Sequence, residues 1–205
     1  MEVRIFREPS TGKLPAEWQR ARTLYYRGMA GDENAFRAAD HLFSELYASH
    51  PALPLIQVYY GSLRLLEAGR TWAVWQKQRL SEQGILLVDS AVRADPQNLE
   101  IRFVRAVTTY HLPAFFHRKQ QSKDDFAHLA RVAERAVRNG QFEPRLAAAS
   151  LYFYGEFLAE DGCKREAIAS WRSAVTLAPG SPAAEGAEKR LRKLGLLSRC
   201  TQKLE

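Results

Sequence analysis

Cysteine is scarce in this sequence, and its scarcity excludes several classes of protein. Among 205 residues there are two cysteines, Cys163 and Cys200. Two thiols this far apart do not make the disulfide framework of a small secreted domain, and they lack the paired spacing of a structural zinc site. No histidine stands near Cys163 in the sequence, so the pattern does not predict a cysteine nucleophile.

Long hydrophobic runs are also missing. No apolar stretch approaches the roughly 18 residues that a membrane-spanning helix requires, and we expect no membrane partner. The opening segment MEVRIFREPSTGK lacks the apolar stretch of a signal peptide, which favours a cytoplasmic location. A periplasmic location is the alternative, because Met1 could replace a removed leader. Residues 199–205 are interpreted as a tail, since the terminal KLE matches the junction of an expression tag.

Motifs that carry chemistry are absent from the sequence as well. It contains no glycine-rich phosphate loop, no H-E-x-x-H, no G-x-S-x-G and no EF-hand loop. Metal sites in helical bundles combine carboxylates with Glu-x-x-His on facing helices. None of the five histidines has such neighbours: they are His41, His50, His111, His117 and His128. The sequence therefore predicts no enzyme, no metal site and no cofactor.

The residues that are present describe a basic globular protein. Hydrophobic residues make up 46% of the chain and charged residues 26%, and the formal net charge is +7. An excess of positive charge favours an acidic partner. A charge of this size also serves solubility, so it does not require a nucleic-acid partner, and we disfavour one. We expect the partner to be a protein or peptide of acidic character.

Helical periodicity runs through almost every segment of about ten residues or more, and no segment alternates apolar and polar residues as a strand would. Alanine, leucine, arginine, glutamate and glutamine fill these segments, and all of them favour helix. The expected helices cover residues 15–29, 33–48, 54–68, 71–94, 99–111, 120–139, 145–160, 164–177 and 182–194. The predicted fold class is all-α.

A repeat pattern occupies the last third of the chain. Its residues follow one another in the order Gly155, Ala167, Trp171, Ala174 and Pro179. Small residues let two antiparallel helices approach closely, the tryptophan fills the space between them, and the proline ends the second helix. These spacings resemble the tetratricopeptide repeat, a helix–turn–helix unit of about 34 residues, although the first Trp and the Tyr of that motif are both Leu here.

Two earlier segments repeat the second half of this pattern. The matching residues are Ala39, Phe43 and Pro51 in one segment and Gly84, Val88, Ala91 and Pro96 in the other. The partner helix of the second segment carries Gly61, which lies 35 residues before Pro96, whereas the corresponding distance in the last pair is 24 residues. This pair is therefore longer by about three helical turns, with residues 71–83 as the insertion.

The end of the chain fits a helix that closes a stack of repeats. Ser181 can cap it with Pro182 at its first position, and an apolar stripe follows at helical spacing. The stripe consists of Ala184, Ala187, Leu191 and Leu194. We predict a single helical-repeat domain over residues 1–198, a short tetratricopeptide-like α-solenoid of about four helix pairs with this capping helix.

A second resemblance concerns the run VRADPQNLEIRFVRAVTTYHLPAFF. It is similar to a segment of an uncharacterised family of bacterial helical-repeat proteins with the pattern D-P-x-N-x-E-I-R-x-x-R…L-P. The resemblance implies a bacterial source and draws attention to Glu100, Arg102 and Arg105, but it implies no mechanism.

Phe115 and Phe116 follow a helix that Pro113 must end. We expect at least one of them to be a hydrophobic plug over the end of the longer pair. The alternative is that one of them lines a ligand groove.

The first helices of the pairs are rich in aromatic residues, and in tetratricopeptide-like stacks these helices line the concave surface. With Gly61 and Gly155 facing the core, neighbouring side chains should project toward the groove; the alternative is that each tyrosine packs between helices. Aromatic residues and arginine commonly anchor bound peptides. The candidate partner-binding residues are Tyr59, Arg102, Arg105, Tyr110 and Tyr152. This predicts a non-enzymatic adaptor that holds a partner segment; the alternative is a helical accessory subunit that binds a small molecule or nucleic acid.

Overall fold

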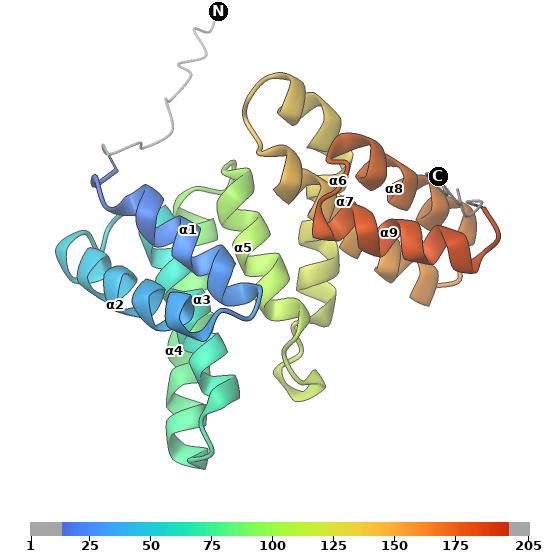
Figure 1. Ribbon diagram of the computed structural model, residues 1–205. Helices are drawn as coiled ribbons and strands as arrows, with labels where there is room; N and C mark the ends of the chain where they lie inside the picture. Colours follow the sequence, from blue (N-terminus) through green and yellow to red (C-terminus); the bar gives the residue numbers. More distant parts are fainter. Residues whose placement is uncertain (1–13, 197–205) are drawn as a thin grey trace, which may run out of the picture. The chain divides into compact units, whose positions relative to one another are not determined.

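The computed structural model describes residues 14–196 of the chain, and this part is helical throughout (Figure 1). Its α-helices are α1 (Trp18–Met29), α2 (Glu33–Ser49), α3 (Pro54–Arg70), α4 (Val74–Ala94), α5 (Leu99–Tyr110), α6 (Lys119–Arg138), α7 (Pro144–Glu160), α8 (Lys164–Leu177) and α9 (Pro182–Lys193). A 3₁₀ helix, η1 (Ala114–Phe116), follows α5. No strand occurs among the described residues, so the predicted all-α class is confirmed. Each predicted helix is present, with ends that differ by at most three residues.

The chain divides into two compact units, which we describe separately. Unit 1 comprises Met1–Thr108 and unit 2 comprises Thr109–Glu205. The predicted tail at residues 199–205 lies outside the described residues, and so does Cys200. Cys163 is exposed and its thiol is free.

In unit 1, helices that follow one another along the chain pack together. α1 packs on α2, α3 on α4, and α2 on α3. The α3–α4 crossing is close because it is built on glycines. A Cβ atom added to Gly84 would lie 2.7 Å from the carbonyl oxygen of Gly61 and 2.6 Å from Cγ of Leu65. Both glycines therefore face the neighbouring helix, as the repeat spacing predicts.

The α3–α4 pair is extended, in agreement with the predicted insertion. α4 has 21 residues, and the end where it joins α3 projects beyond α1 and α2 (Figure 1). The turn between the two helices, residues 71–73, lies at this projecting end.

In unit 2, Trp171 has the position that the repeat pattern predicts. α7 packs on α6, α8 and α9, and α8 also packs on α9. Trp171 of α8 is 4% exposed and lies against Gly155 of α7, where an added Cβ would come within 2.6 Å of the indole Cδ1. Ala167 and Ala174 are fully buried on the same helix. The close helix approach and the filling tryptophan are thus both confirmed.

The last helix buries Ala184, Ala187 and Leu191, as predicted. Leu194 is 50% exposed, so the expected stripe is wrong at its last position. The reason is that the helix ends at Lys193, which leaves Leu194 outside the buried face.

Ser181 caps α9, since its Oγ accepts a hydrogen bond of 3.2 Å from the backbone N–H of Ala184. Replacing Ser181 with alanine should lower the free energy of unfolding by about 1 kcal/mol, because a helix N–H loses its partner. Urea titration followed by far-UV circular dichroism measures the change. Ser181→Asp, which keeps an acceptor at this position, should retain most of the stability. Equal losses in both variants would contradict the capping role.

The predicted phenylalanine plug is wrong. No residue of η1 is buried, and Phe115 is 70% exposed. The two rings contact each other instead, with centroids 4.5 Å apart. The short 3₁₀ turn, which His117 closes in the left-handed conformation, holds this pair away from a core.

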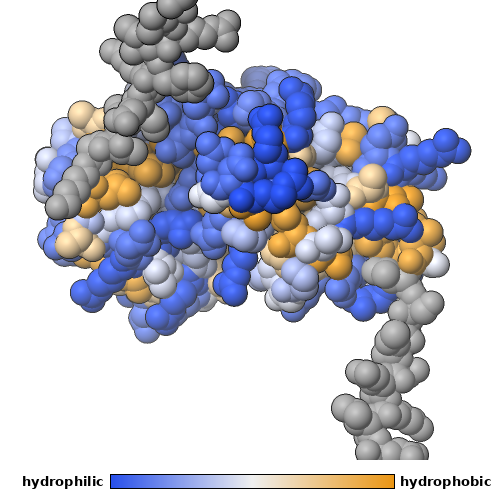
Figure 2. Space-filling view, turned by 90° about the horizontal axis from the view of Figure 1, so that it is seen from above, coloured by the Kyte–Doolittle hydropathy of each residue, from blue (hydrophilic) through white to orange (hydrophobic). Residues whose placement is uncertain are grey.

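Hydrophilic residues dominate the face seen in Figure 2, and hydrophobic residues occupy smaller separate areas there. Among the described helices, none is both long enough and apolar enough to cross a membrane.

Candidate functional site

Tyr59 lies at the centre of unit 1 and has no exposed surface. Its ring stacks on Phe43 at 5.1 Å and meets the edges of Trp18 and Tyr25 at 5.3 and 4.7 Å. Such ring pairs contribute stability beyond the area that they bury. The expectation that Tyr59 projects into a groove is therefore wrong, because α1 and α2 cover the side of α3 that carries it.

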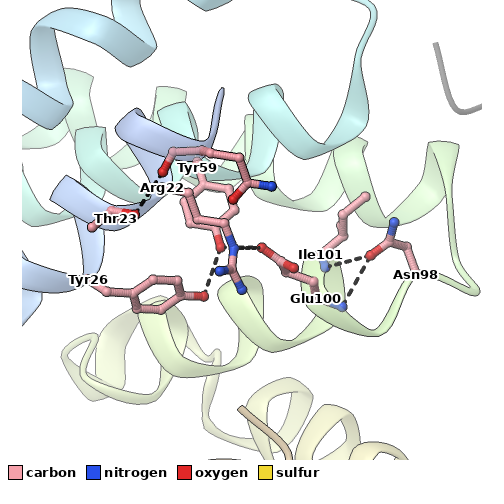
Figure 3. Close-up of polar contacts among 8 residues, drawn as sticks. Arg22, Thr23, Tyr26, Tyr59, Asn98, Glu100 and Ile101 are labelled. Atoms are coloured by element: carbon pink, nitrogen blue, oxygen red, sulfur yellow. Dashed lines mark hydrogen bonds and ion pairs between the residues drawn. The ribbon is translucent and has the colours of Figure 1, made fainter. Parts of the chain in front are cut away.

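The hydroxyl of Tyr59 joins three helices through one hydrogen-bonded network (Figure 3). It donates to Oε1 of Glu100 at 2.6 Å, and Nε of Arg22 donates to the same oxygen at 2.6 Å. The hydroxyls of Tyr26 and Tyr59 lie 2.8 Å apart. Because the single proton of Tyr59 goes to Glu100, Tyr26 must be the donor in this last bond. We call Arg22, Tyr26, Tyr59 and Glu100 the tyrosine network.

The start of α5 positions Glu100. Asn98 caps this helix, since its Oδ1 accepts from the backbone N–H groups of Glu100 and Ile101 at 3.1 and 3.2 Å (Figure 3). Glu100 then falls in the first turn, where the helix dipole favours a carboxylate. The local sequence therefore supplies a well-held anion at the point where α1 and α3 meet α5.

Burial raises the pKa of both phenols of the tyrosine network. It raises the pKa of Tyr59 well above its ordinary value; the neighbouring Tyr26 and Glu100 raise it further, and Arg22 opposes them. Burial is also the main reason that the pKa of Tyr26 is raised, with Glu100 second. At neutral pH each hydroxyl therefore retains the proton that its hydrogen bond requires.

A second chain of hydroxyls lies deeper between the same three helices. Thr108 donates to the carbonyl oxygen of Val104 at 2.6 Å. Ser62 must then donate to Thr108, and Tyr25 to Ser62, each across 2.7 Å. Burial raises the pKa of Tyr25, and its bond to Ser62 partly offsets that rise. The chain fixes the spacing of α1, α3 and α5 below the tyrosine network.

Part of the tyrosine network reaches the surface. The side chains of Arg22 and Glu100 are 18% and 24% exposed, and Tyr26 is half-buried. The guanidinium of Arg22 lies 5.1 Å from the centre of the Tyr26 ring, within the range of a cation–π contact. These three residues form the solvent-accessible edge of the tyrosine network. The buried Tyr59 bonds to two of them, Tyr26 and Glu100.

The two arginines that the sequence singled out differ in exposure. Arg105 is 9% exposed, and its Nη1 lies 3.4 Å from Oδ1 of Asp89 in α4. Arg102 is half-buried and donates from Nη2 to the carbonyl oxygen of Pro96 at 3.0 Å. Arg105 therefore turns toward α4, and of the two arginines Arg102 is the more accessible. Their role toward a partner stays a prediction.

Tyr110 and Tyr152 belong to unit 2, where both are half-buried. Tyr110 packs against Phe153 at 5.0 Å and Phe157 at 5.3 Å. Tyr152 lies over Gly186 of α9, where an added Cβ would be 3.1 Å from its ring. Both tyrosines thus pack between helices with one side open, and their predicted role in binding is a proposal.

Beside Tyr152, an ion pair links α7 to α9. Nε of Arg190 donates to Oε1 of Glu156 at 2.9 Å, and its Nη2 donates to the other carboxylate oxygen. Burial raises the pKa of Tyr152, and the charge of Glu156 raises it further. The pairing resembles that of Arg22 with Glu100 in unit 1, since in each case an arginine and a glutamate on different helices are joined.

Sequence reasoning missed Arg22 and Tyr26. The signal was present: Tyr26 and Tyr59 are 33 residues apart, close to one repeat length, and Arg22 precedes Tyr26 by one helical turn. Within residues 14–196, no group of three or more His, Cys, Asp or Glu side chains is arranged to hold a metal ion. Comparisons with protein-family models, curated proteins and solved structures give no match to this chain.

Proposed function

We propose that this chain is a non-enzymatic interaction module, a short tetratricopeptide-like solenoid that holds an acidic segment of a partner protein. The consecutive helix packing in each unit supports the solenoid arrangement. The glycine contact between α3 and α4, and that of Trp171 with Gly155, support its division into helix pairs. We propose about four such pairs, with α9 as the capping helix.

The partly exposed edge of the tyrosine network carries the proposal. Arg22 and Tyr26 are of the residue types that dominate binding energy at protein interfaces. Hydrogen bonds to Glu100 and Tyr59 already hold both side chains in place. Less side-chain entropy is then lost on binding than from a free arginine and tyrosine, so the edge is pre-organised for a ligand.

The chemistry of the partner follows from charge. The formal net charge of +7 favours the approach of an acidic segment. Arginine recognises carboxylates with planar, directional hydrogen bonds, whereas lysine supplies only a point charge. We therefore place a carboxylate of the partner near Arg22 and an apolar part of it against the ring of Tyr26.

Two surface depressions lie in unit 2, and neither has the form of a typical small-molecule site. One is lined mainly by Glu134, Arg138, Arg172 and Thr176, and the other by Glu143, Arg145, Pro179 and Ser181. Both are open to solvent and carry charged side chains, whereas small-molecule sites are mostly enclosed and apolar.

Replacing Arg22 with alanine should weaken partner binding about tenfold or more, because a pre-organised anchor is lost. Immobilised protein would first capture partners from a lysate of the source organism, and the identified partner would then be purified and titrated by calorimetry. Arg37→Ala is the matched control: it removes the same charge from a side chain that is 76% exposed on α2. The proposal predicts that this control binds as the unchanged protein does.

Two observations complete that test. Binding that depends on Arg22 should weaken as salt rises, since exposed charges are screened. Thermal unfolding must show that Arg22→Ala is folded at the temperature of the titration. Equal affinity of the folded Arg22→Ala and Arg37→Ala variants would exclude this edge as the binding site.

A further inference from the structure

The end of the α3–α4 pair exposes three large apolar side chains. Trp72 is 88% exposed, Val74 is 76% exposed and Trp75 is 74% exposed. The two indole rings lie edge to face with centroids 6.4 Å apart. Soluble proteins rarely expose tryptophans in a contiguous group, and such groups commonly mark interaction sites. We call Trp72, Val74 and Trp75 the tryptophan tip.

The tip is an ordered structure with a filled interior. Ala68, Ala73, Leu80 and Ser81 are buried between the two helices directly behind it. The hydroxyl of Thr71 donates to Oε1 of Gln76 at 3.1 Å across the turn. The inner side of the helix pair is thus filled by Ala68, Ala73, Leu80 and Ser81, while the two tryptophans are exposed at its end. The exposure of the tryptophans is a consequence of how the pair is built.

The chain segment that carries the tip is basic. Residues 70–80 include Arg70, Lys77 and Arg79 and no acidic residue. Lys77 and Arg79 are exposed, whereas Arg70 is held by Glu33 at 2.8 Å. The first turn of α4 also carries no acid, although an acid there would stabilise the helix. The positive end of the α4 dipole therefore adds to the charge of these side chains.

We propose that the tryptophan tip docks on an anionic lipid bilayer. Tryptophan favours the interface between hydrocarbon and headgroups, and basic residues beside it are attracted by anionic lipids. Along α4, Lys77 and Arg79 lie about 4.5 and 7.5 Å beyond Val74. Apolar side chains of bound proteins enter a bilayer by about 5–10 Å, so both cations would reach the headgroups when the tip is inserted. This surface is separate from the tyrosine network.

A protein partner would use this helix differently. Leu86 is 66% exposed on α4 and lies 11 residues after Trp75, which places both on one face about 16 Å apart. A partner helix or a second copy of this chain along that face would cover both side chains. A bilayer that meets the projecting end would cover Trp75 and leave Leu86 in water. Leu86 therefore distinguishes the two occupants.

The test is sedimentation of the full chain with vesicles of phosphatidylcholine alone or of equimolar phosphatidylcholine and phosphatidylserine. We expect binding to the anionic vesicles, lost about tenfold or more in the double variant Trp72→Ala/Trp75→Ala. Lys77→Gln/Arg79→Gln should weaken binding to anionic vesicles, and added salt should act in the same direction. Leu86→Ala should bind as the unchanged chain does.

Intrinsic fluorescence gives an independent signal. The four tryptophans are Trp18, Trp72, Trp75 and Trp171, of which the first and last are 4% exposed. A blue shift of the emission on adding anionic vesicles would therefore report the tip. Absence of binding by the folded chain, or binding that survives loss of both tip tryptophans, would overturn the proposal. Equal losses in Leu86→Ala would do so as well, because the face of α4 that carries Leu86 would then take part in the contact. Arg22→Ala should leave vesicle binding unchanged.

Discussion

Replacing Trp171 with alanine is expected to lower the free energy of unfolding by about 3–5 kcal/mol. The indole is 4% exposed and fills the space that Gly155 leaves between α7 and α8. No residue nearby can take its place, because Ala167 and Ala174 beside it are too small. The cavity would therefore persist in the folded variant and add to the lost transfer free energy. Urea titration followed by far-UV circular dichroism measures the loss.

Trp171→Phe is the matched variant. The indole Nε1 has no hydrogen-bond partner among the described residues, so replacing the ring by another aromatic removes no hydrogen bond. We expect this variant to retain much of the stability lost in Trp171→Ala, with a residual cost from its smaller volume. A loss below about 1 kcal/mol in Trp171→Ala would show that the tryptophan does not fill this core.

Replacing Tyr59 with alanine is expected to cost unit 1 about 3–5 kcal/mol. The ring is fully buried among Trp18, Tyr25 and Phe43. Its hydroxyl bonds to Glu100, so the alanine variant loses aromatic packing and leaves a carboxylate with one donor fewer. Chemical unfolding measures the sum of both effects.

Tyr59→Phe separates the two contributions. It keeps the ring and removes only the hydroxyl, and a hydrogen bond to a charged group contributes about 1.5–3 kcal/mol. The phenylalanine variant should therefore be clearly more stable than the alanine variant. If the two lost equal stability, the hydroxyl network would account for the whole effect and the ring packing would not contribute. If the phenylalanine variant were as stable as the unchanged protein, the hydrogen bond to Glu100 would contribute no net stability.

Local chemistry explains why the helices could be predicted from the sequence. Pro54, Pro144 and Pro182 stand at the first position of α3, α7 and α9, where a missing N–H costs nothing. Asn98 and Ser181 cap the helices that they precede. These signals act within one turn of the chain, so they do not depend on which helices meet in space. The spacing of Gly155 and Trp171 predicted their contact for a similar reason, since a helix pair is itself a local unit.

The direction of Tyr59 could not be predicted in this way. Gly61 faces α4, and from that fact alone Tyr59, two positions earlier on the helix, should point toward solvent. α3 is covered by α2 and α4, and its hydroxyls also bond to α1 and α5. A helix with that many neighbours is buried on most of its circumference. Tyr59 therefore lies in the core although it points away from α4, and its hydroxyl is hydrogen-bonded there.

The exposed tryptophans show the opposite case. In the sequence, Trp72 and Trp75 are large apolar residues in a helical insertion, and such residues are usually buried. They are exposed because the insertion carries the end of the α3–α4 pair beyond α1 and α2, where Ala68 and Ala73 already fill the contact between the two helices. Helix positions and helix pairs follow from short-range sequence signals. Burial depends on which helices from distant parts of the chain lie against a side chain. In unit 1, several helices cover Tyr59, which is buried, and no described helix covers Trp72, which is exposed.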